Sequence, residues 1–474
     1  MNLSAFKAYD IRGRIPDEIN EDLARAVGRA YAGFVKPKRV VVGHDMRLTS
    51  PALAAALTQG LLESGVDVYD IGLCGTEGVY YATAAGDGSG GAFDGGIMVT
   101  ASHNPPDYNG MKFVREGSRP ISADTGLKEM AAMIREGRLP PPAAKVGTRH
   151  TLDTRARYID HLLSYIDRSK LRRLKVVVDP GNGGAGPFVD LLAPHLPFEF
   201  IKVRHAPDGN FPNGVPNPML EANRAPTIEA IRKHGADVGL AWDGDFDRCF
   251  FFDHTGRFIE GYYLVGLLAQ SFLEREPGAR IVHDPRLTWN TLDIVRTHGG
   301  VPVLCKSGHA FIKQKMREVD GAYGGEMSAH HYFRDFAYCD SGMVPWLLVL
   351  ERLCASGQSL ADLVGERMRL FPCSGEINRR IPDVPDAIKA VQAYYAAQAT
   401  SVDHTDGLSM EFEAAAKAGS GASAGAWRLN LRGSNTEPLI RLNVEARGSE
   451  ALMQEKTAEV LALLATRGAV AADH

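Results

Sequence analysis

The sequence contains little cysteine, and its cysteines are widely spaced. Among 474 residues there are six, and no two form a Cys-x-x-Cys pair: Cys74, Cys249, Cys305, Cys339, Cys354 and Cys373. This spacing argues against a disulfide framework and against a zinc site, because both need grouped cysteines. Sparse reduced thiols are typical of the cytoplasm, and we expect the protein there.

The sequence also lacks an excess of charge of either sign. Its 53 basic and 57 acidic residues give a net charge of −4, so no overall field attracts nucleic acid or an anionic membrane. No apolar run reaches the ~18–20 residues of a membrane span. The charged first residues do not resemble a secretory signal. We expect neither a nucleic acid nor a membrane partner, and any phosphate must be bound by local clusters.

Glycine, in contrast, is abundant at 50 of 474 residues, above the usual ~7%. The length is typical of about three or four domains. Residues 20–35 carry apolar side chains at helical spacing, and residues 39–43 and 66–71 are apolar strand candidates. Between these strands, a helix is predicted to begin at Thr49-Ser50-Pro51, with a hydroxyl N-cap and Pro at N1, and to stop at Gly65. Strand, helix and strand in this order predict a parallel α/β sheet.

This unit is repeated along the chain. A basic residue, an apolar strand and a final aspartate recur at residues 39–45, 175–179 and 280–284. The repeat predicts three related α/β domains, although any α/β protein can offer such strands. After residue 371 we expect a smaller α+β domain, with helices at 387–397 and 453–464 and strands at 427–432 and 439–444. Residues 82–96 and 414–426 are rich in Gly, Ala and Ser and are predicted to be flexible surface insertions.

Two loops that follow apolar strands carry candidate chemistry. In TASHNP, Ser102 stands at a strand end beside His103 and could be a nucleophile or a phosphate carrier; the alternative is an ordinary turn. In DGDFDR, Asp243, Asp245 and Asp247 alternate after a strand and could converge on one hard cation, Mg²⁺ or Ca²⁺. The alternative is an acidic surface turn.

Further polar segments suggest ligand contacts. In GGEMSAH, Glu326 and Ser328 could bind sugar hydroxyls, and the alternative is a turn. In RGSNTEP, the side chains and backbone N–H groups could form a compact anion site, and the alternative is a polar hairpin. YDIRG near the start could be a solvated tail, and the histidine of KSGH could be structural. These segments contribute the candidates Tyr9, Arg12, His309, Arg432, Ser434, Asn435, Thr436 and Arg441.

Together and in this order, the segments resemble the α-D-phosphohexomutase family. The matching strings are YDIRG, TASHNPPDYNGMK, DGDFDR, KSGHAFIK, GEMSAHHYF and RGSNTEP, from Tyr9 to Pro438. The GEMS form and YFRDFAYCDSGM resemble the bacterial phosphomannomutase branch. The resemblance implies three similar α/β domains with mixed sheets and a smaller α+β C-terminal domain around a central cleft. Their expected ranges are 1–154 for phosphoserine, 155–256 for metal, 257–370 for sugar and 371–474 for phosphate.

The resemblance also implies a role for each site residue. Ser102 would be the phosphoserine, and with Asp243, Asp245 and Asp247 it would hold Mg²⁺. The catalytic set would be completed by Arg12, His103, Lys112, Arg248 and His330. The substrate-binding residues would be Tyr9, Arg286, His309, Glu326, Ser328, Arg432, Ser434, Asn435, Thr436 and Arg441. Family members often carry Lys at the position of Arg286 and Gly at that of Ala329.

The implied reaction interconverts mannose 6-phosphate and mannose 1-phosphate through a hexose 1,6-bisphosphate, which also serves as activator. A base must take the hydroxyl proton, and Lys112 or His330 is favoured, with Arg12 assisting. The product would feed GDP-mannose and polysaccharide synthesis, and the protein would be a monomer or a small homo-oligomer. The alternatives are a phosphoglucomutase or dual-specificity enzyme, an aspartyl-phosphate phosphatase that uses Asp243 and Asp245, and a non-catalytic sugar-phosphate binding protein.

Overall fold

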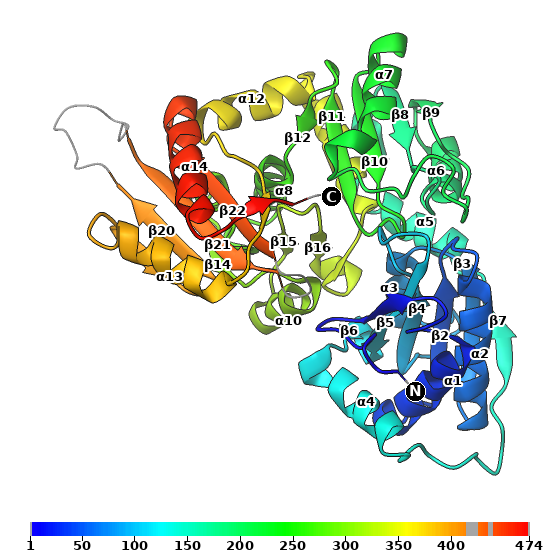
Figure 1. Cartoon of the computed structure of the whole chain (residues 1–474). Coiled ribbons are helices and arrows are strands. Elements are labelled where there is room, and N and C mark those ends of the chain that lie inside the picture. Colours follow the sequence, from blue (N-terminus) through cyan, green and yellow to red (C-terminus); the bar gives the residue numbers. More distant parts are fainter. Residues whose placement is uncertain (1, 414–424, 435–438, 473–474) are drawn as a thin grey trace. The chain divides into compact units, whose positions relative to one another are not determined.

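The computed structural model describes residues 2–413, 425–434 and 439–472, and the chain divides into two units (Figure 1). Unit 1 comprises Met1–Phe258 and His330–Gly357, and unit 2 comprises Ile259–Ala329 and Gln358–His474. The expected boundaries of four domains remain predictions. Within the described ranges, no helix combines the length and apolarity needed to cross a membrane.

The first sheet of unit 1 is mixed and has seven strands. Its order is β1-β5-β4-β2-β3-β7, with β6 paired to β5. The strands β2, β3 and β4 are parallel, whereas β5 runs antiparallel to β4 and β1. The predicted strand–helix–strand unit is thereby confirmed. The bounds are β1 Ile11–Arg14, β2 Arg39–His44, β3 Asp67–Leu73, β4 Gly95–Val99, β5 Tyr108–Arg115, β6 Arg119–Pro120 and β7 Arg149–Thr151.

Helices cover both faces of this sheet. Helices α1 (Glu21–Val35), α2 (Ser50–Glu63) and α4 (Leu127–Arg135) share a core with Val40 and Val42. Val41, which points to the opposite face, packs with Ala82 of α3 (Thr76–Ala85). The predicted start of α2 needs one correction. The Thr49 hydroxyl makes no capping bond and instead accepts a hydrogen bond from Asn109.

The prediction of a flexible surface insertion at residues 82–96 is wrong at both ends. Its first residues belong to α3 and its last to β4, and Phe93 is buried. The small residues allow close packing: a Cβ on Gly96 would stand 2.3 Å from Thr83 Oγ1, and one on Gly95 would stand 2.7 Å from the Val114 carbonyl oxygen. Most of the second predicted insertion, at 414–426, lies outside the described residues.

The second sheet of unit 1 carries the acidic loop of residues 243–247, which follows β10. Its order is β12-β11-β10-β8-β9, with β8 parallel to β9 and β10 and with β11 antiparallel to β10. The unit is completed by the antiparallel pair β16–β17. The bounds are β8 Lys175–Asp179, β9 Glu199–Lys202, β10 Val238–Trp242, β11 Cys249–Asp253, β12 Phe258–Ile259, β16 His331–Phe333, β17 Cys339–Asp340, α5 Arg155–Leu163, α6 Gly186–Leu192, α7 Ala225–His234 and α11 Val344–Ser356.

Unit 2 begins with a third α/β arrangement, in which β13 is parallel to both β14 and β15. The elements are α8 Gly261–Arg275, β13 Arg280–His283, α9 Trp289–Thr297, β14 Val301–Leu304, α10 His309–Val319, β15 Tyr323–Gly325 and α12 Leu360–Leu370. The three repeated segments predicted from the sequence share one hydrogen bond. The aspartates that follow or end β2, β8 and β13 each accept the backbone N–H two residues later.

The last part of unit 2 is an antiparallel sheet in the order β19-β20-β21-β22-β18-β23 (orange and red in Figure 1). Helices α13 and α14 contact each other and share one core with Leu429, Leu431 and Leu442. Alternation therefore assigns Arg428, Arg432 and other polar residues to the opposite face. The bounds are β18 Ile377–Arg380, α13 Val384–Tyr395, β19 Ser401–Asp403, β20 Leu408–Phe412, β21 Trp427–Gly433, β22 Leu439–Ala446, α14 Glu450–Ala465 and β23 Val470–Ala471.

Candidate active site

Ser102 lies in the loop after β4, where the chain adopts an unusual conformation. Its φ of 48° is in the left-handed region, which non-glycine residues rarely occupy. Ser102 is buried, and its Oγ donates a hydrogen bond to Asp243 Oδ2 at 2.7 Å. Such strain at a buried polar residue is typical of functional sites. The loop thus presents a single hydroxyl to the acidic cluster of the second sheet.

The three predicted aspartates come together after β10. Each of Asp243, Asp245 and Asp247 is buried and offers an oxygen within 4.8 Å of the others. Gly244 allows this, because a Cβ there would stand 2.4 Å from the Ser102 carbonyl oxygen. Asp245 Oδ1 has no hydrogen-bond partner among the described residues. Carboxylate and hydroxyl oxygens with an unused buried lone pair fit a hard cation such as Mg²⁺.

Burial and mutual repulsion control the charges of this cluster. Burial, reinforced by the charge of Asp245, raises the pKa of Asp247 to about 8. Burial also opposes ionisation of Asp245, but the adjacent Lys112 ammonium outweighs it and lowers its pKa. Lys112 Nζ lies 2.7 Å from Asp245 Oδ2 and 2.6 Å from Asp247 Oδ2. These carboxylates outweigh burial and raise the pKa of Lys112, so Lys112 remains an ammonium ion.

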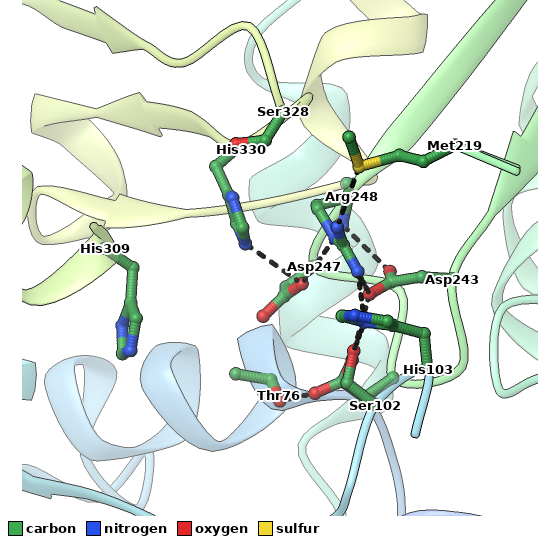
Figure 2. A network of polar contacts seen from close by, with 12 residues as sticks. Thr76, Ser102, His103, Met219, Asp243, Asp247, Arg248, His309, Ser328 and His330 are labelled. Carbon is green, nitrogen blue, oxygen red and sulfur yellow. Dashed lines mark hydrogen bonds and ion pairs between the residues drawn. The ribbon is translucent and has the colours of Figure 1, made fainter. Parts of the chain in front are cut away.

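Arg248 and His103 complete the polar network around Ser102. Figure 2 shows both side chains directed toward Asp243 and Ser102. Arg248 donates from Nε and Nη2 to Asp243 Oδ2 at 3.0 and 2.8 Å. His103 Nδ1 lies 3.0 Å from Ser102 Oγ and 2.5 Å from Arg248 Nη2. Burial and the charge of Arg248 hold the pKa of His103 well below its ordinary value, so His103 is a neutral acceptor.

Two arginines hold the serine loop from outside the network. Arg12 of β1 donates to the Ala101 carbonyl at 3.3 Å and to Asn104 Oδ1 at 2.7 Å. Arg47 is buried and donates to the carbonyls of Ser102, Asn104, Pro105 and Tyr108 at 2.6–2.9 Å. One planar guanidinium thus fixes four carbonyl groups of the loop. Tyr9, the remaining candidate of this segment, is half-buried.

His330 lies close to the acidic cluster on the side of β16. Its Nε2 is 3.6 Å from Asp247 Oδ1, and its backbone forms a bridge with Arg248 (Figure 2). Asp340 of β17 offers an oxygen within 4.8 Å of a carboxylate oxygen of Asp247 and of a ring nitrogen of His330. Unit 1 therefore contains the whole predicted catalytic set, which is the serine, two arginines, two histidines and the lysine, together with the three carboxylates.

The candidates for sugar contacts lie in unit 2. Arg286, which is buried, donates to Asp284 from Nε at 2.8 Å and to Ser328 Oγ at 3.2 Å, and it lies 3.4 Å from Glu326. Glu326 also accepts the backbone N–H of Gly308 at 2.9 Å. His309 begins α10. The KSGH and GEMS segments are therefore joined by the hydrogen bond between Gly308 and Glu326. Ala329 has a φ of 70°, a left-handed conformation that favours glycine.

Two of the predicted phosphate residues, Arg432 and Arg441, lie on the polar face of the antiparallel sheet. Arg432 of β21 and Arg441 of β22 are directly opposite each other. Both pair with Glu376, at 3.0 and 3.1 Å. Ser434 follows β21, and its N–H donates to the Leu439 carbonyl. Asn435 and Thr436 lie outside the described residues, so their placement stays a prediction.

Four residues around these sites are absent from the sequence-based candidates: Arg47, Thr76, Asp340 and Glu376. Thr76 Oγ1 donates to Asp245 Oδ2 at 2.5 Å. Arg47 had a detectable signal, because His44-Asp45-Met46-Arg47 matches His283-Asp284-Pro285-Arg286 in the internal repeat. The sequences around Thr76 and Glu376 contain no comparable repeat.

Comparison with known proteins gives a consistent result along the chain. Domains I, II and III of the phosphoglucomutase/phosphomannomutase family, described as α/β/α, match residues 3–139, 156–256 and 260–371. The family's C-terminal domain matches residues 376–463. The chain belongs to this family. The predicted α-D-phosphohexomutase resemblance and the fold class of three α/β domains plus a C-terminal α+β domain are confirmed.

Individual relatives agree over their full lengths. The chain is 60% identical over 467 residues to a protein of Xanthomonas campestris pv. campestris named "Phosphohexose mutases", covering 98% of this chain and all of that protein. It is 57% identical to a phosphomannomutase of Salmonella montevideo, covering 98% and 99%. A phosphoglucomutase/phosphomannomutase family structure from Burkholderia thailandensis matches with a TM-score of 0.87 at 33% identity, covering 100% and 99%. The protein is an isomerase, a phosphohexose mutase.

Proposed function

We propose that the protein is a phosphomannomutase that interconverts mannose 6-phosphate and mannose 1-phosphate. The observation that carries this proposal is the buried Ser102 hydroxyl, held 2.7 Å from Asp243 beside Arg248. Relatives named phosphomannomutase at 54–57% identity over their full lengths support the mannose substrate. The mannose 1-phosphate would supply GDP-mannose synthesis.

In the proposed mechanism, the phosphoryl group of phospho-Ser102 passes to O1 of mannose 6-phosphate. The Oγ–P bond breaks as the O1–P bond forms, and the hydroxyl proton of O1 goes to a base. The resulting mannose 1,6-bisphosphate turns round, its 6-phosphoryl group returns to Ser102, and the proton returns to O6. Transfer of this kind depends on positioning and charge neutralisation. We assign the phosphate that is not transferred to Arg432, Ser434, Asn435, Thr436 and Arg441.

Each charged residue then has a defined task. Asp243, Asp245, Asp247 and Ser102 would hold Mg²⁺, which when bound supplies positive charge to the phosphoryl oxygens. Arg248, which is anchored on Asp243, would place its guanidinium against the same oxygens. Lys112 holds its proton firmly between two carboxylates, so it is better suited to neutralise charge than to act as base. His330, near Asp247, is the base that we propose.

The decisive experiment is intact-mass measurement with peptide mapping of the purified enzyme. Phosphorylation of Ser102 would add about 80 Da, with the properties of a phosphoester. Ser102→Ala should lack this species and lose mutase turnover, whereas Ser4→Ala, an exposed serine, should keep both. Full turnover in Ser102→Ala would refute the mechanism. Release of the phosphate by hydroxylamine would indicate the aspartyl-phosphate alternative.

Dual activity on mannose and glucose phosphates is the second candidate. It is favoured by the 60%-identical relative, whose name specifies only a hexose. Mannose and glucose differ at O2, whereas Glu326 and Ser328 are proposed to contact O3 and O4. Near-equal kcat/KM values for mannose 1-phosphate and glucose 1-phosphate would establish dual specificity and refute selectivity for mannose.

A further inference from the structure

Glu376 lies at the centre of a buried charge cluster in unit 2, immediately before β18. Its Oε2 is 3.0 Å from Arg432 Nη2 and 3.5 Å from Arg286 Nη1, and its Oε1 is 3.1 Å from Arg441 Nη1. Only 7% of the Glu376 side chain is exposed. One carboxylate therefore contacts three guanidinium groups, each of which is a proposed substrate ligand.

The sheet register explains why a carboxylate is needed here. Arg432 and Arg441 are directly opposite on adjacent antiparallel strands, where like charges destabilise the pair. The neighbouring strand β18 runs alongside β22, so Glu376 at its start can reach both arginines. Burial opposes ionisation of Glu376, but the charges of Arg286, Arg441 and Arg432 prevail and lower its pKa to about 2. Glu376 is thus an anion under all working conditions.

The arginines are only partly used by Glu376. It contacts the Nη atoms of each, and Arg432 Nε is buried without a partner among the described residues. A guanidinium offers five N–H donors, whereas a carboxylate accepts along one edge. A phosphate oxygen can therefore approach the same arginines, in competition with the carboxylate that already neutralises them.

We propose that Glu376 is a built-in competitor for the substrate phosphate, which weakens the phosphate site enough for the bisphosphate to turn round. The proposal rests on the proposed function, in which the non-transferred phosphate binds Arg432 and Arg441 and must leave them once per turnover. A site that binds ground state and transition state equally tightly does not raise kcat. By pairing with the vacated guanidinium groups, Glu376 lowers the free-energy cost of releasing the phosphate.

Glu376→Gln tests the proposal, because it removes the charge and keeps the shape. We expect KM for mannose 6-phosphate to fall about tenfold, within the roughly 5- to 150-fold range of coupled sites. We expect kcat to fall as well, because the bisphosphate is released more slowly. Direct titration with inorganic phosphate should show tighter binding without any turnover. A structural role alone predicts the opposite, a higher KM, since the arginines would lose their anchor.

Matched variants separate the possible outcomes. Glu413→Gln removes the carboxylate partner of the exposed Arg447 in the same unit and should leave KM and kcat unchanged. Glu376→Gln combined with Arg441→Gln restores the net charge and should return phosphate affinity toward wild type, and it serves as the test if the single variant fails to fold. An unchanged or higher KM in Glu376→Gln, or a double variant that binds inorganic phosphate no more tightly than Arg441→Gln alone, would overturn the proposal.

Failure of the underlying function would look different. Arg432→Gln should raise KM for mannose 6-phosphate if the arginine binds phosphate at all. If Arg432→Gln leaves KM unchanged, the phosphate site itself is misassigned. If Arg432→Gln raises KM while Glu376→Gln does not lower it, the phosphate site stands and the competitor role of Glu376 is refuted.

Discussion

The buried carboxyl group of Glu77 predicts how the stability of unit 1 changes with pH, in both sign and approximate magnitude. This residue in the first turn of α3 is fully buried in unit 1. Its carboxyl group accepts hydrogen bonds from Tyr158 Oη and from the backbone N–H groups of Gly342 at 2.5 Å and Met343 at 3.3 Å. Burial nevertheless dominates and raises the pKa of Glu77 to about 8. Thr76, the preceding residue, donates to Asp245, so the same helix end supports the acidic cluster.

The raised pKa makes stability depend on pH in a defined direction. The folded protein binds the Glu77 proton more tightly than the unfolded chain, whose pKa is the ordinary 4.5. The stabilisation is therefore complete below the unfolded pKa and is lost as pH rises through about 8. At about 1.36 kcal/mol per pKa unit, raising the pH from roughly 6 to 8 costs about 2 kcal/mol. For units of this size that is a shift in Tm of roughly 4–8 °C.

Glu77→Gln should abolish this contribution, because the amide does not titrate in the range. The difference in Tm between Glu77→Gln and wild type should shift in favour of the variant between pH 6 and pH 8, as followed by calorimetry of the transition of unit 1. Tyr158→Phe is the matched control, since it retains the carboxyl group and removes a bond that lowers its pKa. That variant should keep the pH dependence. A Tm difference for Glu77→Gln that is identical at both pH values would refute the reasoning.

Two backbone predictions concern the loops of the site. Gly244→Ala should lower kcat about 100-fold or more, because its Cβ would stand 2.4 Å from the Ser102 carbonyl oxygen and a displacement of about 1 Å can cost that much. The control is Gly365→Ala, which has open space around it and should keep full activity. A fully active Gly244→Ala would contradict the close packing of the two loops. Ala329→Gly should raise stability by about 0.5 kcal/mol, because relief of roughly 1–2 kcal/mol of left-handed strain exceeds the ~0.5–1 kcal/mol entropy of glycine. Chemical denaturation checks the latter, and a loss of stability would contradict it.

The regular elements and the polar loops were predictable because their signals are local. The strand before Ser102 and the strand before Asp243 end where the sequence indicates, and both loops stand at strand ends. The contact between them, 141 residues apart, comes from the packing of two sheets and has no local signal. The same holds for Glu376, which is recognisable only once strand register shows two arginines facing each other.

Composition was the least reliable guide. Gly95 and Gly96 belong to a run that is rich in glycine and alanine, yet both are buried in β4, where a larger side chain would collide with the neighbouring strand or helix. Glycine serves flexible turns and close packing equally well, and only periodicity of the surrounding apolar residues distinguishes them. In this stretch the small residues concealed only the first two residues of β4, Gly95 and Gly96, whereas the apolar residues up to Val99 indicated the strand that leads to Ser102.

The repeated His-Asp-x-Arg segments show how one scaffold supports different chemistry. In both copies the histidine Nδ1 lies about 3 Å from the carbonyl oxygen of the aspartate, and the aspartate accepts the N–H of the arginine. Arg47 donates hydrogen bonds to the carbonyls of the Ser102 loop, whereas Arg286 contacts Glu326 and Ser328. The backbone arrangement is thus shared, and the loop against which the arginine lies decides its task.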